Sequence, residues 1–187
     1  MKERYDKSYI AIPLQESPLF DWAESLNTEK KFSHVTLFFL GSISETKLDK
    51  IKPIVSKAME VLDGSELKPK KLAVLGKDYK SFVILIENTQ KLKAAREILE
   101  NSLPEFKSKN LPFVPHITIK SLSFYDLSAG TFDAFMESKD ISSTISPYVP
   151  TSLGVYYRTE EDATALLYSK KPKQLAITSQ GSAVKFF

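Results

Sequence analysis

The only two histidines of this chain stand in the same short pattern. Residues 33–38 (SHVTLF) and 115–120 (PHITIK) each read histidine, apolar residue, threonine, apolar residue. Random placement would put this pattern after both histidines about once in ten thousand sequences of similar composition. The repeat therefore indicates a shared role for His34 and His116.

The pattern suits acid–base chemistry on a phosphodiester. Side chains two residues apart lie on one face of a β-strand, so His34 should sit beside Thr36, and His116 beside Thr118. With pKa values near 6.5, one imidazole can accept a proton while the other donates one. Threonine hydroxyls can donate hydrogen bonds to an anion held between them. The rest of the chain must then bring the two strands together.

Composition sets broad limits on the kind of protein. The 187 residues are 42% hydrophobic and 26% charged, which fits one globular domain. Cysteine is absent, so disulfides, a thiol nucleophile and thiolate metal sites are excluded. The N-terminus does not resemble a signal peptide, and no apolar run reaches the roughly 20 residues of a membrane span. We therefore expect a cytoplasmic protein that has no membrane partner.

The net charge of +3 permits an anionic ligand. The positive charge is nearly all lysine, because the chain has only three arginines, Arg4, Arg96 and Arg158. Duplex-binding surfaces more often carry clustered arginine, so the composition does not favour a protein that coats nucleic acid.

Periodicity and turn residues predict an α+β order of elements. Gly41 should end the strand that carries His34, and Ser44 should cap the helix that follows. On that strand Phe38 should share the face of His34, while Val35, Leu37 and Phe39 pack under a helix. The predicted strands are 8–14, 32–40, 67–75, 81–87, 113–121, 141–145, 152–158 and 163–169, and the predicted helices are 19–26, 44–62, 88–103 and 125–139.

The two halves of the chain resemble each other weakly. Each half runs strand, helix, histidine strand, helix, and His34 and His116 are 82 residues apart, close to half the chain length. This spacing favours a pseudo-two-fold arrangement with one histidine strand from each half.

The two motifs, with the strand before the first motif and Phe38-Phe39-Leu40-Gly41 at its end, resemble the 2H phosphoesterase superfamily. This superfamily includes LigT-like 2′-5′ RNA ligases and RNA cyclic phosphodiesterases. The resemblance covers residues 8–170, which we expect to form one domain followed by a C-terminal tail at 171–187. It implies a bilobal α+β fold, with two pseudo-symmetric halves and antiparallel sheets around a central groove.

The resemblance also implies an activity. We expect a phosphoric diester hydrolase that needs no metal or other cofactor. Its substrates would be 2′,3′-cyclic phosphate RNA ends or 2′-5′-linked oligonucleotides. His34 and His116 would form the acid–base pair, and Thr36 and Thr118 would hold the phosphate. The family suggests that His34 protonates the leaving oxygen and His116 activates water, although the residues alone leave this polarity open.

Four further residues are candidates for substrate binding. Many bacterial members have a small residue and an arginine after the second motif, where this chain has Lys120 and Ser121. Lys120 can supply the positive charge or simply be solvated. Arg158 can contact phosphate or be a surface charge. Phe38 and Tyr157 can stack on a base or belong to the core.

Two other functions are compatible with the same residues. Some viral and phage members of the superfamily destroy oligonucleotide immune signals, such as 2′-5′ oligoadenylate or cyclic di- and trinucleotides. A non-catalytic nucleotide- or RNA-binding module would also keep the groove, although it would not need both histidines. In either case we expect a monomer with a small nucleotide or an RNA end as its partner.

Overall fold

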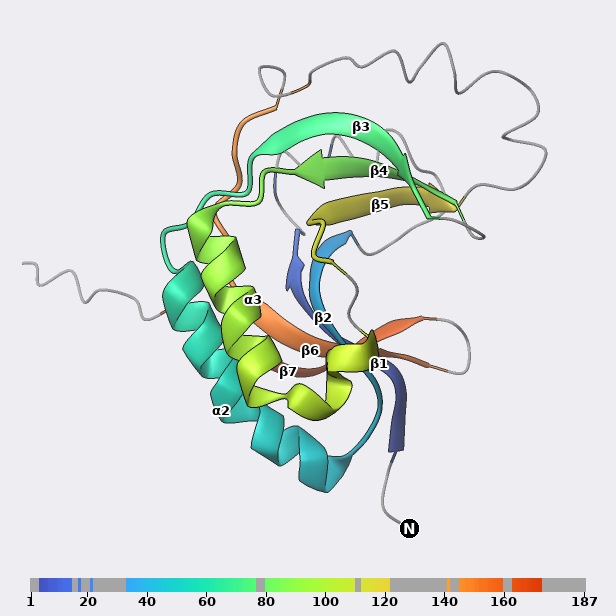
Figure 1. The fold of residues 1–187 in the computed structure, drawn as a ribbon, viewed down its shortest axis with the longest axis vertical. Coiled ribbons are helices and arrows are strands. Elements are labelled where there is room, and N and C mark those ends of the chain that lie inside the picture. The colour runs from blue at the N-terminus through green and yellow to red at the C-terminus, as the bar shows by residue number, and fades with distance from the viewer. Residues whose placement is uncertain are drawn as a thin grey trace, which may run out of the picture.

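The computed structural model describes residues 4–14, 17, 21, 33–76, 80–109, 112–121, 141, 145–159 and 163–172. Its described part is an antiparallel sheet of seven strands with helices packed on one face (Figure 1). The strand order is β3-β4-β5-β2-β1-β6-β7. The strands are β1 (Arg4–Pro13), β2 (His34–Ser44), β3 (Pro69–Leu75), β4 (Ser81–Ile86), β5 (His116–Ser121), β6 (Leu153–Arg158) and β7 (Thr164–Lys170). The helices are α2 (Glu45–Leu62), α3 (Gln90–Ser102) and the 3₁₀ helix η1 (Pro104–Lys109).

The sheet consists of two lobes that meet at one point. Strands β2, β1, β6 and β7 form one lobe, and β3, β4 and β5 form the other. Between the lobes, β2 and β5 share a single registered pair, Val35 with Ile117. The two histidine strands are therefore the junction of the lobes, as the pseudo-two-fold arrangement requires.

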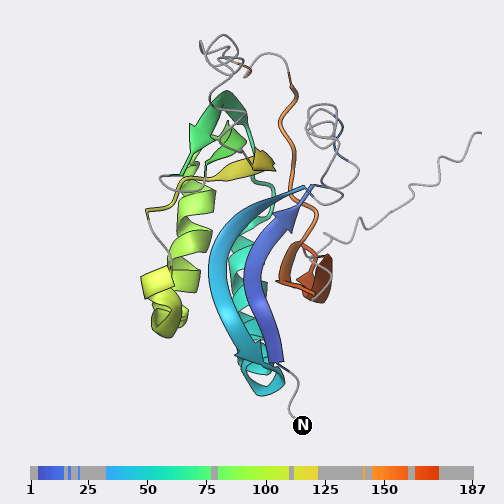
Figure 2. The same ribbon diagram turned by 90° about the vertical axis from the view of Figure 1, so that its right-hand side faces the viewer.

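The core lies between the sheet and the two long helices. Strands β1 and β2 curve along α2 (Figure 2), and α3 packs beside α2. Fully buried residues from both layers meet there, including Val35, Leu37, Ile51, Leu92 and Ile117. Burying this face leaves the opposite face of the junction for polar side chains.

The cap of α2 is the predicted Ser44, and Thr89 caps α3 in the same way. The Ser44 hydroxyl accepts a hydrogen bond from the Lys47 amide at 3.3 Å, and the Thr89 hydroxyl accepts one from the Leu92 amide at 3.3 Å. These bonds satisfy amides that have no partner within the first helical turn. Gly64 follows α2 with φ of 63°, a left-handed conformation that glycine adopts without steric cost.

Strand β2 differs from the prediction because it contains two bulges. Ile10 and Ala11 pair with Phe38 and Thr36, so Leu37 is an extra residue, and a second register shift lies between Phe39 and Gly41. An extra residue reverses the alternation of side chains beyond it. The expectation that Gly41 ends the strand is wrong, because β2 continues through Gly41, with φ of 68°, to Ser44.

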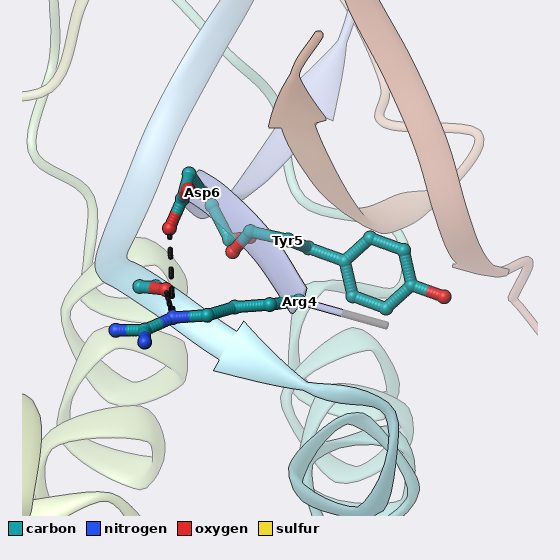
Figure 3. A network of polar contacts seen from close by, with 5 residues as sticks. Arg4, Tyr5 and Asp6 are labelled. Atoms are coloured by element: carbon teal, nitrogen blue, oxygen red, sulfur yellow. Dashed lines mark hydrogen bonds and ion pairs between the residues drawn. The ribbon is translucent and has the colours of Figure 1, made fainter. Parts of the chain in front are cut away.

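Other boundaries also differ. Strand β1 begins at Arg4 rather than at residue 8, and Arg4 donates a hydrogen bond to the Ser42 hydroxyl on β2. Arg4 also forms an ion pair with Asp6 (Figure 3). Ile141 and Ile145, the ends of a predicted strand, lie outside strands and are buried in the core. Most of the predicted helix at 19–26, and all of that at 125–139, fall outside the described residues. No helix in the described part is long and apolar enough to cross a membrane.

Candidate active site

Four motif side chains converge where β2 meets β5. The Val35–Ile117 pair is fully buried on the helix side. Because the strands are antiparallel, one further step on each side puts His34 opposite Thr118 and Thr36 opposite His116. Directly opposite residues have Cβ atoms about 5 Å apart. All four side chains are half-buried, so the junction presents two imidazoles and two hydroxyls on one face.

The imidazole of His116 is oriented by the backbone. Its Nδ1 lies 2.7 Å from the carbonyl oxygen of Val114. A carbonyl oxygen can only accept, so Nδ1 carries the proton and donates it to this bond. In the neutral ring, Nε2 is then the atom able to accept a proton.

The imidazole of His34 is oriented by aromatic rings. It stacks on Tyr9 of β1, with ring centroids 5.0 Å apart and an interplanar angle of 26°. Tyr9 in turn stacks on Tyr156 of β6, with centroids 5.9 Å apart and an angle of 25°. The Tyr9 hydroxyl lies 3.3 Å from the Thr164 hydroxyl of β7. His34 thus ends a stack of three rings that crosses three strands.

Both tyrosines of the stack are neutral at physiological pH. Burial raises the pKa of Tyr9, while the Thr164 hydrogen bond and the positive charge of Arg158 oppose this rise. Burial, with smaller contributions from Tyr9 and Tyr148, raises the pKa of Tyr156 to about 12. The stack therefore presents uncharged phenols beside His34.

Two candidate cations lie near the face that carries His34, Thr36, His116 and Thr118, which we call the motif face. Lys120 follows Thr118 by two residues on β5 and is half-buried. A bulge separates the two, because Thr118 pairs with Val83 whereas Lys120 pairs with Phe82 of the main core, so the register turns Lys120 away from the motif face. Arg158 is exposed near the end of β6, close enough to the Tyr9 phenol to influence its pKa. Strand alternation puts Arg158 on the same face of β6 as Tyr156. Of the two candidate cations, Arg158 therefore lies on the motif face and Lys120 does not.

Phe38 does not lie on this face. The bulge at Leu37 turns its ring into the core, where it is 0% exposed and lies under the Arg96 guanidinium, 4.9 Å from it. A fully buried ring offers no surface to a base, so the expectation that Phe38 contacts substrate is wrong. Phe39 lies on the motif face instead, since it pairs with Tyr9 and is 50% exposed.

Tyr157 is also turned away from the motif face. It lies between Tyr156 and Arg158 on β6, and its ring packs edge-on against Tyr5, with centroids 5.2 Å apart. Tyr5 belongs to the margin of the main core and points away from Arg4 and Asp6 (Figure 3). Tyr157 therefore stabilises the β1–β6 pair from the opposite side of the sheet.

Tyr9, Tyr156 and Phe39 lie on the motif face as well, but they are not among the site residues predicted from the sequence. A usable signal exists for Tyr9, because it alternates with Ile10 and Ile12 along β1 and so must face away from the core. Phe39 gave no such signal, since its orientation depends on the bulge. Among the described residues, no group of three or more histidine, aspartate or glutamate side chains could hold a metal ion.

Solved structures share this fold. E. coli LigT complexed with NADP+ matches with a TM-score of 0.61 and 18% identity, over 91% of this chain and 99% of that one. A structure described as a phosphoesterase gives 0.61 and 16%, over 90% and 99%. The protein TT0787 of Thermus thermophilus gives 0.59 and 13%, over 88% and 97%. No protein-family model and no curated protein sequence matches the chain.

The fold class is therefore established. The chain has the α+β fold of the LigT-like 2H phosphoesterase structures, with a mostly antiparallel sheet, as the resemblance predicted. At this level of sequence identity the likeness concerns the fold, and the chemistry has to be argued from the residues at the β2–β5 junction.

Proposed function

We propose that this protein is a metal-independent phosphodiesterase that hydrolyses 2′,3′-cyclic phosphate RNA ends or 2′-5′-linked oligonucleotides. One observation carries the proposal. The Val35–Ile117 pair joins the two histidine–threonine motifs, and the histidine and threonine of each motif are half-buried. Continued antiparallel pairing would put the histidine of each motif opposite the threonine of the other. If the histidines and threonines were only structural residues, nothing would require the two motifs to lie side by side in this symmetric way.

The proposed reaction uses both imidazoles. Nε2 of His116 takes a proton from a water molecule, whose oxygen attacks phosphorus. The bond between phosphorus and the leaving ribose oxygen then breaks, and His34 donates a proton to that oxygen. For a 2′,3′-cyclic phosphate the product is a phosphomonoester. The hydrogen bond from His116 Nδ1 to Val114 supports this polarity, because it leaves Nε2 as the proton acceptor.

The threonine hydroxyls and one cation would stabilise the phosphate. Thr36 and Thr118 would lie beside the opposite histidines, where they can donate to the non-bridging oxygens as negative charge grows on them. Lys120 lies beyond the bulge in β5 and has no part in this scheme. Arg158, further along the motif face of β6, would attract the remainder of an anionic substrate. Both proton transfers are supplied by imidazole, so this scheme requires no metal-bound water.

A nucleotide ligand is supported by the similar structures and by Phe39. E. coli LigT has been crystallised with NADP+ and with 3′-AMP. In this chain the half-exposed ring of Phe39 lies on the motif face, three residues along β2 from Thr36. Three residues of extended chain span about 10 Å, so Phe39 can stack on a base that neighbours the phosphate.

A turnover panel in EDTA tests the proposal. The substrates are a 2′,3′-cyclic nucleotide, a 2′-5′ oligoadenylate, cyclic di- and trinucleotides, and a 3′-5′ oligonucleotide as reference. We expect His34→Ala and His116→Ala each to lower turnover at least about a hundredfold, with circular dichroism unchanged. Val149→Ala, at an exposed apolar position, serves as the matched control and should retain full turnover.

The panel also separates the alternatives. Cleavage of the cyclic di- or trinucleotides in preference to the 2′,3′-cyclic nucleotide would indicate an enzyme that degrades oligonucleotide signals. Tight binding without cleavage of any substrate would indicate a binding module. Wild-type turnover in the His34→Ala/His116→Ala double variant would refute the mechanism.

A further inference from the structure

We propose that Tyr9 is a positioning residue for His34, and that Tyr156 and Gly154 hold Tyr9 in place. The proposal rests on the proposed acid–base function of His34, but it concerns residues to which the sequence motifs give no role. The observation behind it is the stack His34–Tyr9–Tyr156, which is built from strands β2, β1 and β6.

Small residues beside the tyrosines make the stack possible. On the motif face of β1, Ala11 is the one residue between Tyr9 and Pro13, and Pro13 pairs with His34. A methyl group at position 11 lets the Tyr9 ring lean along the strand until it contacts the imidazole. Tyr9, Ala11 and Tyr156 together form a small buried cluster separate from the main core.

Gly154 leaves room for the ring of Tyr156, as Ala11 does for that of Tyr9. It pairs with Ala11 across the β1–β6 ladder. A Cβ atom at position 154 would lie 2.7 Å from the ring of Tyr156, closer than such atoms come in proteins. The glycine therefore allows Tyr156 to lie over the backbone of β6, parallel to Tyr9 over Ala11. Both rings lean toward His34 for this reason.

The hydroxyl of Tyr9 is anchored as well. Its contact with Thr164 connects the stack to β7 at the outer edge of the lobe. Tyr9 and Tyr156 are 6% and 5% exposed, so the rings are confined on their sides as well as at their faces. A confined ring can hold the plane of a half-buried imidazole, which a solvent-exposed ring could not do.

The two imidazoles have different kinds of neighbour. His116 bonds to a carbonyl oxygen two residues before it, and His34 stacks on a ring from another strand. A local backbone contact survives most substitutions, while a ring from another strand can be removed by one substitution. Tyr9 is thus the point at which His34 can be perturbed without touching the motif.

The test compares Tyr9→Phe, which keeps the ring, with Tyr9→Leu, which removes it. The protein has two histidines, so their imidazole carbon–proton resonances are resolved by NMR and assigned with His34→Ala and His116→Ala. We expect Tyr9→Leu to move the His34 resonances downfield, because the ring current is lost, and to leave those of His116 in place. Turnover should fall about tenfold through kcat, whereas Tyr9→Phe should retain both turnover and shifts.

Controls separate this role from general stability and from the proposed function. In a His34→Ala background Tyr9→Leu should have no further effect on kcat, because Tyr9 acts through His34. If Tyr9→Leu does not fold, Gly154→Ala displaces Tyr156 and should move the same His34 resonances. Unchanged His34 resonances or unchanged kcat in the folded variant would overturn the proposal. Failure of the proposed function would show separately, as wild-type turnover in His34→Ala.

Discussion

Replacement of Arg96 by methionine should destabilise the protein through the bulge in β2. Arg96 lies on α3 and is 6% exposed. It donates to the carbonyl of Leu37, the extra residue of the bulge opposite Ile10 and Ala11. Its guanidinium also lies over the rings of Phe38 and Phe113, 4.9 and 5.2 Å from their centroids. Arg96 therefore holds the local geometry that turns Phe38 inward.

The magnitude follows from these contacts. A buried carbonyl left without a donor costs about 1–3 kcal/mol. Each cation–π contact adds about 0.5–2 kcal/mol in a buried setting. Removing a buried guanidinium also removes its desolvation cost, which offsets part of this loss. Methionine keeps the apolar stem, so we expect a net loss of about 3 kcal/mol in the free energy of unfolding.

The assay is urea unfolding followed by circular dichroism, with two comparison variants. Arg96→Lys keeps the charge and one donor and should lose less than Arg96→Met. Glu100→Gln removes an ion pair of 2.7 Å whose acidic side chain is 32% exposed, so it should cost at most about 1 kcal/mol. An Arg96→Met protein within about 0.5 kcal/mol of wild type would refute the idea that this side chain maintains the bulge.

Three other perturbations have expected outcomes of their own. The pKa of Tyr156 is raised to about 12, so the folded state resists ionisation that the unfolded chain undergoes from about pH 10. Stability should therefore fall by up to about 2–3 kcal/mol as pH rises from 10 to 12, and less in Tyr156→Phe, as urea midpoints at pH 9 and 11 would show. Gly41→Ala, at φ of 68°, should cost about 1 kcal/mol and Gly41→Asn less, measured by the same unfolding assay; an alanine variant as stable as wild type would contradict the strain argument. Phe39→Ala should raise KM for an oligonucleotide about tenfold with kcat unchanged, whereas Leu166→Ala, at an equally exposed apolar position on β7, should change KM little.

The helical parts of the fold were predictable because their signals are local. Ser44 caps its helix as expected, and the buried residues of α2, including Ile51 and Val55, recur at helical spacing in the sequence. A cap and a helical stripe depend on residues within a few positions of one another, so the sequence contains the whole cause.

The prediction was wrong where the orientation of side chains on a strand depends on the neighbouring strands. Strict alternation put Phe38 on the face of His34, whereas the bulge opposite Ile10 and Ala11 buried Phe38 and exposed Phe39. A bulge is a mismatch between two strands, and its stabilising partner, Arg96, lies 59 residues further along the chain. No local pattern in residues 34–44 reports it.

The candidate site also has features that follow from the local sequence and features that depend on contacts between distant segments. The four motif residues could be identified from the chain alone, because a histidine and a threonine two positions apart must share a face in any strand. The pairing of Val35 with Ile117, and the orientation of His116 by Val114 and of His34 by Tyr9, became visible only in the folded molecule. Strand order and register are set by contacts between distant segments, and the orientation of each imidazole depends on which groups those contacts bring beside it.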